Sequence, residues 1–380
     1  MSLQPNNEVR LMLEVLKAYF QKRPMDKTLA AHIDWPKFFE MQDLHGLQPM
    51  LNAMFKKNGL PFPERYEVEL SQFGMKQAIF DLSFKAEYAK LKAEFDKHNL
   101  PILAFKGFVF SDYLYPESLR AGGDLDLLIS KKHIIESLRL LESFDYKIHN
   151  YFNGQIITVE EVQGQLKNNF VHEVSMIKNQ LHLDIHWGLC YDFLPYTYPD
   201  DFLFELDKEE QIFWTLLNHH GGKESWLRLK ELADFGAFMQ KVGNDWDWPP
   251  IIEKMKTFKL HRQFLHGLYL IDTFLDIEIP PALKSIERQI NHTCPNLVLK
   301  FWNKGKHWKT TFERIAYERI LVKSQDPSSS TFEYVRNFMR AYTRPNSVEE
   351  KRLITFPENY LFLNFLSKVL TYALNRTFKK

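Results

Sequence analysis

The sequence predicts an α+β fold in which a small mixed β-sheet core is flanked by an N-terminal and a C-terminal helical region. Over the first hundred residues, apolar side chains recur at three- and four-residue steps, which is typical of amphipathic helices. Strand and helix patterns alternate between about residues 100 and 190, and helical spacing returns beyond Pro199. We therefore expect a helical region at 1–99, an α/β core at 100–200 and a second helical region at 201–380.

The composition is that of a folded globular protein. A chain of 380 residues can form two or three packing units, because a single core seldom grows beyond about 250 to 300 residues. Lysine plus arginine (49) nearly equal aspartate plus glutamate (48), so the net charge gives no argument for a nucleic-acid or membrane partner. The spacing of Cys190 and Cys294 supports neither a disulfide framework nor a zinc site, which favours a reducing compartment.

No targeting segment is recognisable in the sequence. The N-terminus lacks the basic, apolar and small-residue parts of a signal peptide, and no run reaches the roughly eighteen apolar residues of a membrane helix. We therefore expect a soluble cytoplasmic protein with no membrane partner. The sequence gives no indication of its oligomeric state.

The expected elements follow the chain in order. Helices are predicted at 8–20 and 75–98, with Asn99 and Pro101 ending the second. In the core we expect a strand at 101–105, a short helix at 107–115, a strand at 124–129, a helix at 131–144 and a hairpin of 172–177 with 181–187. Further helices are predicted at 209–220, 226–242 and 262–275.

Two carboxylates interrupt the apolar run of the second strand, "GGDLDLLIS". Residues two apart on a strand point to the same face, so Asp124 and Asp126 can converge on one cation. Asp184 lies in a second alternating stretch, "LHLDIHW", and can join them if the two strands are neighbours. Three carboxylates suit Mg²⁺ together with a phosphate-bearing substrate. Alternatively, Asp124 caps the strand while Asp126 and Asp184 pair with lysine or arginine.

The stretch "LAFKGFVFSDYLYPESLRAGGDLDLLI" resembles the signature of a family of uncharacterised bacterial nucleotidyltransferases within the polymerase-β-like superfamily. "HLDIHW" is similar to its third acidic element, and "NHHGGKESWLRLKELADFG" resembles its following helical segment. Together these segments cover most of residues 100–240. The resemblance implies a nucleotidyltransferase core at 100–200.

The resemblance also implies a reaction. The enzyme would be a Mg²⁺-dependent transferase, with Mn²⁺ as a further candidate cofactor, and would move a nucleoside monophosphate from a nucleoside triphosphate to an acceptor and release pyrophosphate. Asp124 and Asp126 would bind both metal ions and Asp184 the catalytic one. The acceptor is left open among a small molecule, a protein side chain and an RNA end.

Three further residues are candidates for binding the nucleotide. Gly107 would let the backbone approach a phosphate, and Lys106 could add a positive charge there. The fork of Arg120 suits an oxygen of the triphosphate; its alternative is an ion pair with Glu117. The superfamily usually has Gly-Ser or Gly-Gly where this chain has Lys106-Gly107, which favours the alternative of a catalytically inactive nucleotide-binding or scaffold protein.

Several polar residues are supporting candidates. His182 and His186 share the face of Asp184, but histidine matches Mg²⁺ poorly, so we expect supporting or structural roles for them. The cluster of His219, His220, Lys223 and Arg228 either contacts phosphates or acceptor, or surrounds a helix end at Gly221-Gly222. We expect a structural role for Asp234.

Two other interpretations are less favoured. The basic and aromatic segment 300–323 resembles nucleic-acid-binding surfaces, but it also fits the solvated face of a helix pair, which we expect. A glycosyltransferase that binds a nucleotide sugar through D-x-D would have a βα-alternating domain before that motif. Here the preceding hundred residues have helical spacing.

Overall fold

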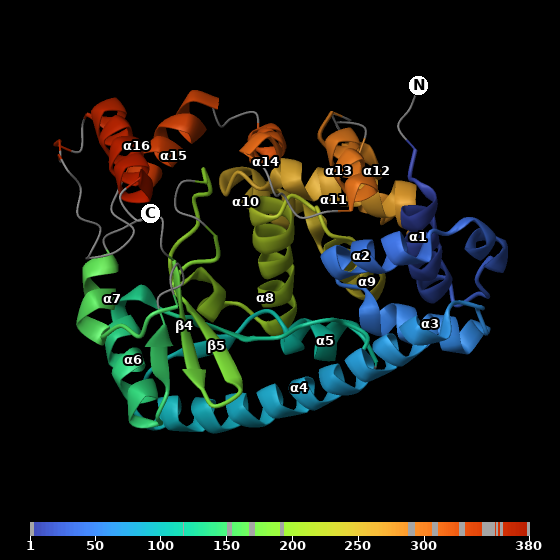
Figure 1. Ribbon diagram of the computed structural model, residues 1–380, viewed down its shortest axis with the longest axis horizontal. Helices are drawn as coiled ribbons and strands as arrows, with labels where there is room; N and C mark the ends of the chain where they lie inside the picture. Colours follow the sequence, from blue (N-terminus) through green and yellow to red (C-terminus); the bar gives the residue numbers. More distant parts are fainter. Residues whose placement is uncertain are drawn as a thin grey trace.

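The computed structural model describes a defined part of the chain, with a small sheet at one end and most of the helices packed beside and above it (Figure 1). The described residues are 4–116, 118–149, 154–166, 172–190, 194–287, 293–305, 311–326, 331–343, 354, 356–357 and 360–377. The long helix α4 runs beneath both the sheet and the first helices. None of the described helices is long and apolar enough to cross a membrane.

The elements follow the chain in three groups. The first group is α1 (Asn7–Phe20), η1 (Lys27–His32), α2 (Trp35–His45), α3 (Gln48–Asn58) and α4 (Glu64–Lys97). The second is β1 (Ile102–Ala104), α5 (Phe108–Leu114), β2 (Leu125–Ile129), η2 (Lys131–His133), α6 (Ile134–Ser143), β3 (Lys147–His149), α7 (Val159–Gln165), β4 (Glu173–Lys178) and β5 (Leu181–His186). The third is η3 (Phe202–Glu205), α8 (Lys208–Thr215), η4 (Leu216–Lys223), α9 (Leu229–Val242), α10 (Trp248–Thr257), α11 (His261–Leu275), η5 (Pro281–Leu283), α12 (Lys284–Glu287), α13 (Thr293–Lys304), α14 (Thr311–Ser324), α15 (Thr331–Thr343) and α16 (Leu361–Thr377).

The five described strands form one mixed sheet in the order β1-β2-β5-β4-β3. β2 and β5 are parallel, whereas the other neighbouring pairs are antiparallel. The predicted hairpin is present as β4 and β5. The predicted α+β class with a small mixed sheet between helical regions is therefore confirmed.

The two larger of three hydrophobic clusters among the described residues support this arrangement. One lies at the sheet and joins β1, β2, β4 and β5 with α6 and the end of α4. The other joins helices from both ends of the chain, including α1, α9 and α11. In α1 the apolar stripe is buried, and the side chain of Asn6 caps the helix by accepting a hydrogen bond from the Val9 N–H. The sheet is thus held against a helical body made of sequence-distant segments.

The helix predicted at 209–220 is only partly correct. α8 ends at Thr215, and the chain continues as a π-helix, η4. A Cβ on Gly222 would lie 2.8 Å from the Tyr196 ring, so this tight packing requires glycine. Wider π turns are rare and concentrate at functional sites. Here the π-helix carries Lys223 to Glu173 on β4 and His220 to Asp234 on α9.

We expect His266→Leu to stabilise the protein. His266 is buried, and its ring nitrogens have no hydrogen-bond partner among the described residues. Burial lowers its pKa to about 3. The unfolded chain therefore takes up a proton below about pH 6.5 that the folded protein excludes, so this group costs stability as pH falls.

Urea unfolding at two pH values tests this expectation. At pH 7 the variant should gain about 1 to 2 kcal/mol from removal of the unpaired polar group. At pH 5 its advantage over the parent should grow by about 2 kcal/mol. An advantage that does not change with pH would contradict the assigned cause.

Candidate active site

The parallel pairing of β2 and β5 brings two of the predicted acids together. Asp126 lies directly opposite Asp184 in the strand register. Asp126 is 6% exposed, whereas Asp184 is half-buried and accepts a hydrogen bond of 2.7 Å from Ser175 Oγ on β4. Asp184 was expected to join Asp124 and Asp126 only if its strand lay beside theirs. Its strand, β5, does lie beside β2.

Asp124 stands immediately before β2, beside the turn at Gly107. Burial, followed by the negative charges of Asp126 and Asp184, raises the pKa of Asp124 to about 6, while Lys106 acts in the opposite direction. Gly107 has φ of +50°, and a Cβ there would lie 3.1 Å from the Asp124 carbonyl oxygen and 3.7 Å from Asp126 Oδ2. Glycine therefore lets this turn pack against the acids.

Lys106 forms an ion pair with the buried acid. Its Nζ lies 2.6 Å from Asp126 Oδ1. Burial acts to raise the pKa of Asp126, but the charge of Lys106 and a hydrogen bond with His186 outweigh it and hold that pKa well below its usual range. Lys106, predicted to bind phosphate, thus neutralises Asp126, as the alternative interpretation expected for this acid, whereas Asp184 lies beside His182 and not beside a lysine or arginine of the described residues.

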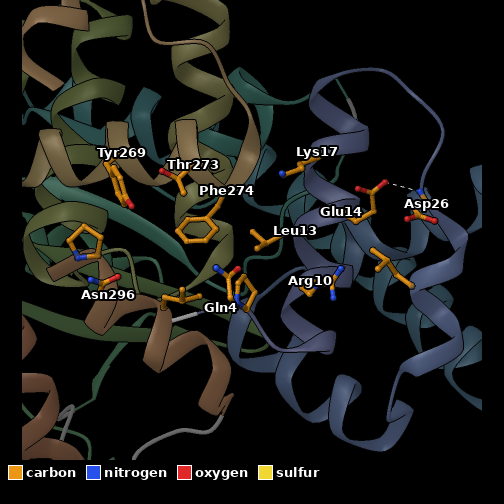
Figure 2. A pocket seen from close by; sticks show the side chains of 14 residues that line it. Gln4, Arg10, Leu13, Glu14, Lys17, Asp26, Tyr269, Thr273, Phe274 and Asn296 are labelled. Atoms are coloured by element: carbon orange, nitrogen blue, oxygen red, sulfur yellow. Dashed lines mark hydrogen bonds between the residues drawn. The ribbon is translucent and has the colours of Figure 1, made fainter. Parts of the chain in front are cut away.

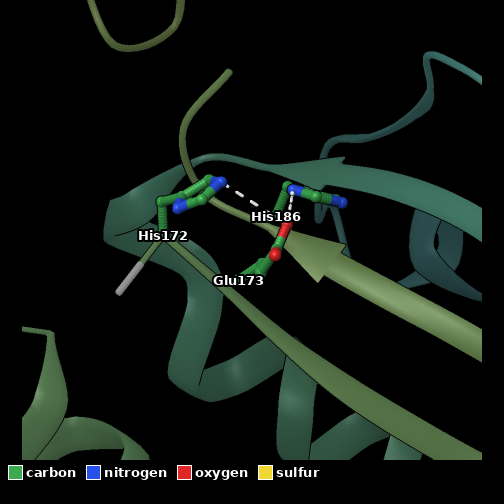
Figure 3. Close-up of side chains that lie close together, drawn as sticks. All are labelled: His172, Glu173 and His186. Carbon is green, nitrogen blue, oxygen red and sulfur yellow. Dashed lines mark ion pairs between the residues drawn. The ribbon is translucent and has the colours of Figure 1, made fainter. Parts of the chain in front are cut away.

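His186 is buried between two carboxylates. Its Nε2 lies 3.1 Å from Asp126 Oδ1, and its Nδ1 lies 3.0 Å from Glu173 Oε2. Figure 3 shows Glu173 between the rings of His186 and His172, whose Nε2 is 3.4 Å from the same Glu173 oxygen. Glu173 was not among the predicted site residues. The predicted strands left residues 178–180 as the turn, whereas the observed hairpin pairs Lys178 with Leu181 and thereby Glu173 with His186.

Lys223 extends this cluster from the π-helix. Its Nζ lies 3.9 Å from Glu173 Oε2 and 3.5 Å from His172 Nε2. Burial acts to raise the pKa of Glu173, but the positive charges around it, beginning with His186, hold it well below the usual range. Of the predicted supporting residues, His186 and Lys223 therefore meet beside the acids.

Arg120 is only 8% exposed and is bound inside the protein. Its Nε lies 2.8 Å from Asp234 Oδ2, and its Nη1 donates to the Gly107 carbonyl oxygen at 3.3 Å. Its predicted alternative partner, Glu117, lies outside the described residues. In this geometry Arg120 supports the Gly107 turn from behind, and Asp234 has the structural role expected for it.

The remaining histidines and arginine of the predicted cluster have different neighbours. His220 Nε2 lies 3.0 Å from Asp234 Oδ2 within the buried network, and His219 packs on His220. Arg228 pairs with Glu231 and Glu224 rather than with the acids. The cluster therefore divides, with only Lys223 joined to the sheet.

Lys230 on α9 is a basic residue that sequence analysis missed. It is half-buried and forms no hydrogen bond or ion pair with any residue in the described part of the chain. Burial, followed by the charges of Arg120 and Arg228, lowers its pKa to about 8. Its charge also acts to lower the pKa of Asp124. Because α9 reaches the site only through tertiary packing, no local pattern marked this lysine.

Among the described residues, two groups of side chains have donor atoms close enough together to hold a metal ion. The donor atoms of Asp126, Asp184 and His186 lie within 4.8 Å of one another, as do those of His172, Glu173 and His186. The first group contains the two carboxylates of Asp126 and Asp184, of which Asp184 is only half-buried. This group fits a divalent cation. His182 also approaches it, with Nε2 3.5 Å from Asp184 Oδ1.

A cavity of about 630 Å³ lies elsewhere, between α1, α11 and α13 (Figure 2). Its walls include Arg10, Glu14, Lys17, Tyr269 and Phe274, and it shares no lining residue with the carboxylate site. Lys17 is paired with Asp276, and Glu14 with Arg23. The cavity is therefore separate from the acids.

The basic and aromatic segment 300–323 partly belongs to the helical core. Trp302 on α13 is buried, and its Nε1–H donates to the Trp226 carbonyl oxygen at 3.1 Å. Trp308 lies outside the described residues. The burial of Trp302 agrees with the packing role expected for this segment.

Comparison with known proteins gives one match. A family model described as an uncharacterised nucleotidyltransferase matches residues 31–276, more than half of the chain. No curated protein and no solved structure matches. The matched range contains every residue of the carboxylate site, from Lys106 to Lys230.

Proposed function

We propose, because the chain belongs to the uncharacterised nucleotidyltransferase family, that its carboxylate site transfers a nucleoside monophosphate from a nucleoside triphosphate to an acceptor and releases pyrophosphate. The observation that carries this proposal is the register of Asp126 with Asp184 on neighbouring parallel strands, with Asp124 at the start of the same strand. Such a trio supplies the oxygen ligands that divalent cations take in phosphoryl transfer.

The residues have separate roles in this proposal. Asp124, Asp126 and Asp184 would hold Mg²⁺ or Mn²⁺, which neutralises phosphate charge and aligns the attacking and leaving oxygens when bound. Asp184, the more exposed acid on β5, is placed to accept the proton of an acceptor hydroxyl. Once a cation binds Asp126 in place of Lys106, the Lys106 ammonium would pair with a phosphate oxygen instead.

We expect Lys230 to bind the triphosphate. It is a half-buried lysine whose charge acts to lower the pKa of Asp124, and it has no ion-pair partner among the described residues, so an incoming phosphate would supply its missing counterion. Lys230→Ala should weaken nucleoside triphosphate binding by about tenfold, the size of one charge-assisted contact. Lys241→Ala on the same helix is the matched control, because Lys241 is exposed and donates to the Tyr113 carbonyl oxygen. Equal affinities of both variants, measured by calorimetry, would remove Lys230 from the site.

A second candidate function is a catalytically inactive nucleotide-binding or scaffold protein. The observation that favours it is the ion pair of Lys106 with Asp126, which neutralises the buried acid without a metal ion. This candidate predicts binding of a nucleoside triphosphate without cleavage between its α- and β-phosphates.

The position of a radioactive label distinguishes the nucleotidyltransferase from the inactive nucleotide-binding protein. The protein is incubated with α-³²P- or γ-³²P-labelled nucleoside triphosphates, Mg²⁺ or Mn²⁺, and separated small-molecule, protein and RNA fractions as acceptors. Nucleotidyl transfer places only the α label on the acceptor and releases pyrophosphate. Transfer of the γ label would show phosphoryl transfer instead, and intact nucleotide despite tight binding would favour the inactive candidate.

A further inference from the structure

We propose that His186 Nε2 is the third protein ligand of the cation held by Asp126 and Asp184, and that the site therefore prefers a first-row transition dication over Mg²⁺. The inference rests on the proposed function in that it concerns the same carboxylate site. It also revises the supporting role that the sequence suggested for His186.

The first step is the direction of the imidazole ring. His186 is buried on β5, two residues beyond Asp184, so both side chains lie on one face of the sheet. Its Nε2 lies 3.1 Å from Asp126 Oδ1, and the donor atoms of all three residues fall within 4.8 Å of one another. A cation bound between the two carboxylates would therefore meet a ring nitrogen.

The second step is the partner of the other ring nitrogen. Glu173 Oε2 lies 3.0 Å from His186 Nδ1, so Nδ1 can donate to it, and a cation that binds would take the Nε2 lone pair after the Nε2 proton is released to solvent. Metal-ligating histidines commonly donate their other ring N–H to a carboxylate, which fixes the tautomer and the orientation of the imidazole ring. Glu173 is thus a positioning residue for this ligand.

The cluster shown in Figure 3 is the supporting layer rather than the cation site. Its donors are His172, Glu173 and His186. The ammonium of Lys223 already lies 3.5 Å from His172 Nε2 and 3.9 Å from Glu173 Oε2. His186, His172 and Lys223 all contact Glu173 Oε2, and these contacts hold the carboxylate against the His186 ring.

Lys106 provides a second, independent mark of the cation position. Its Nζ lies 2.6 Å from Asp126 Oδ1 and 3.5 Å from His186 Nε2, so one positive group already sits between these two donors. A cation that binds there must displace Lys106. An uncharged side chain at this position should therefore tighten metal binding in the absence of nucleotide.

The chemistry of the donor set gives the metal preference. Mg²⁺ takes oxygen ligands almost exclusively, whereas imidazole nitrogen suits first-row transition metals. Two carboxylates with one imidazole therefore favour a cation such as Mn²⁺ over Mg²⁺. Asp126 and Asp184 would remain oxygen ligands of this cation, so the cation would still be able to bind a phosphate of the nucleotide.

Electron paramagnetic resonance with Mn²⁺ alone tests the proposal without relying on catalysis. The parent protein should bind Mn²⁺ at least about tenfold more tightly than Mg²⁺, and its echo-modulation spectrum should contain a ¹⁴N coupling from a directly bound nitrogen. His186→Gln should remove that coupling and most of the preference. His182→Gln is the matched control, because His182 approaches Asp184 from the exposed side and should keep the coupling.

Two further variants test the surrounding contacts. Glu173→Gln should weaken Mn²⁺ binding by about tenfold, as loss of an orienting carboxylate does elsewhere. Lys106→Met should strengthen it. The parent spectrum decides the matter even if His186→Gln fails to fold: bound Mn²⁺ with no ¹⁴N coupling, or a coupling lost only in His182→Gln, overturns the proposal. Either result leaves nucleotidyl transfer intact, whereas a ¹⁴N-coupled site without nucleotide turnover would overturn only the proposed function.

Discussion

Asp184→Asn is expected to lower nucleotide transfer by about a thousandfold, because it removes one of the charges that would hold the cation on the reacting phosphate. The substitution should leave the fold intact. The amide that replaces the carboxylate retains an oxygen that can accept the hydrogen bond from Ser175 Oγ, and the ion pair between Lys106 and Asp126 is not touched.

Measuring both pyrophosphate release and urea unfolding of Asp184→Asn separates a loss of activity from a loss of stability. Asp112→Asn is the control, because Asp112 is an exposed acid on α5 that pairs with Lys85 outside the site. It should match the parent in both measurements. Activity of Asp184→Asn within a factor of about ten of the parent would exclude Asp184 as a ligand of the catalytic cation.

Asp234→Ala is expected to destabilise the protein by about 3 to 5 kcal/mol, the cost of leaving a buried charge without its partner. Asp234 is fully buried and bonds with Arg120, the Tyr115 hydroxyl at 2.9 Å and His220. Burial acts to raise its pKa, but Arg120 and His220 outweigh this and hold it below the usual range. Its removal would strand the guanidinium that supports the Gly107 turn.

Denaturant unfolding of Asp234→Ala tests this cost. Asp276→Asn is the comparison, since Asp276 forms a more exposed ion pair with Lys17 and asparagine tolerates its left-handed backbone, so the change should cost at most about 1 kcal/mol. A loss below about 1 kcal/mol for Asp234→Ala would mean that the buried network does not support the fold.

The fold class was predictable because it follows from the local spacing of apolar residues in the sequence. The stripe of α1 and the alternation around Asp184 each repeat within a few residues. The shared face of Asp126 and Asp184 follows from the same period, but only once β5 lies beside β2. That adjacency depends on sheet order, which no local pattern in either strand specifies.

The rest of the site depends on contacts between distant segments. Arg120 meets Asp234 across 114 residues, so its interior role could not be read from its own neighbourhood. Lys223 reaches Glu173 and His172 from the π-helix, about fifty residues further along the chain. Glu173 lies on the predicted hairpin, but its pairing with His186 depends on the observed register, in which Lys178 pairs with Leu181.

Calorimetric titration of nucleoside triphosphates into the folded protein, with Mg²⁺ or Mn²⁺ and without metal, tests the central claim most directly. The comparison is Asp124→Asn/Asp184→Asn, which removes two acids and retains the ion pair of Lys106 with Asp126. The account predicts saturable, metal-dependent binding by the parent that disappears in the double variant. Absence of binding by the folded parent, or equal binding by the double variant, would contradict a nucleotide site at these carboxylates.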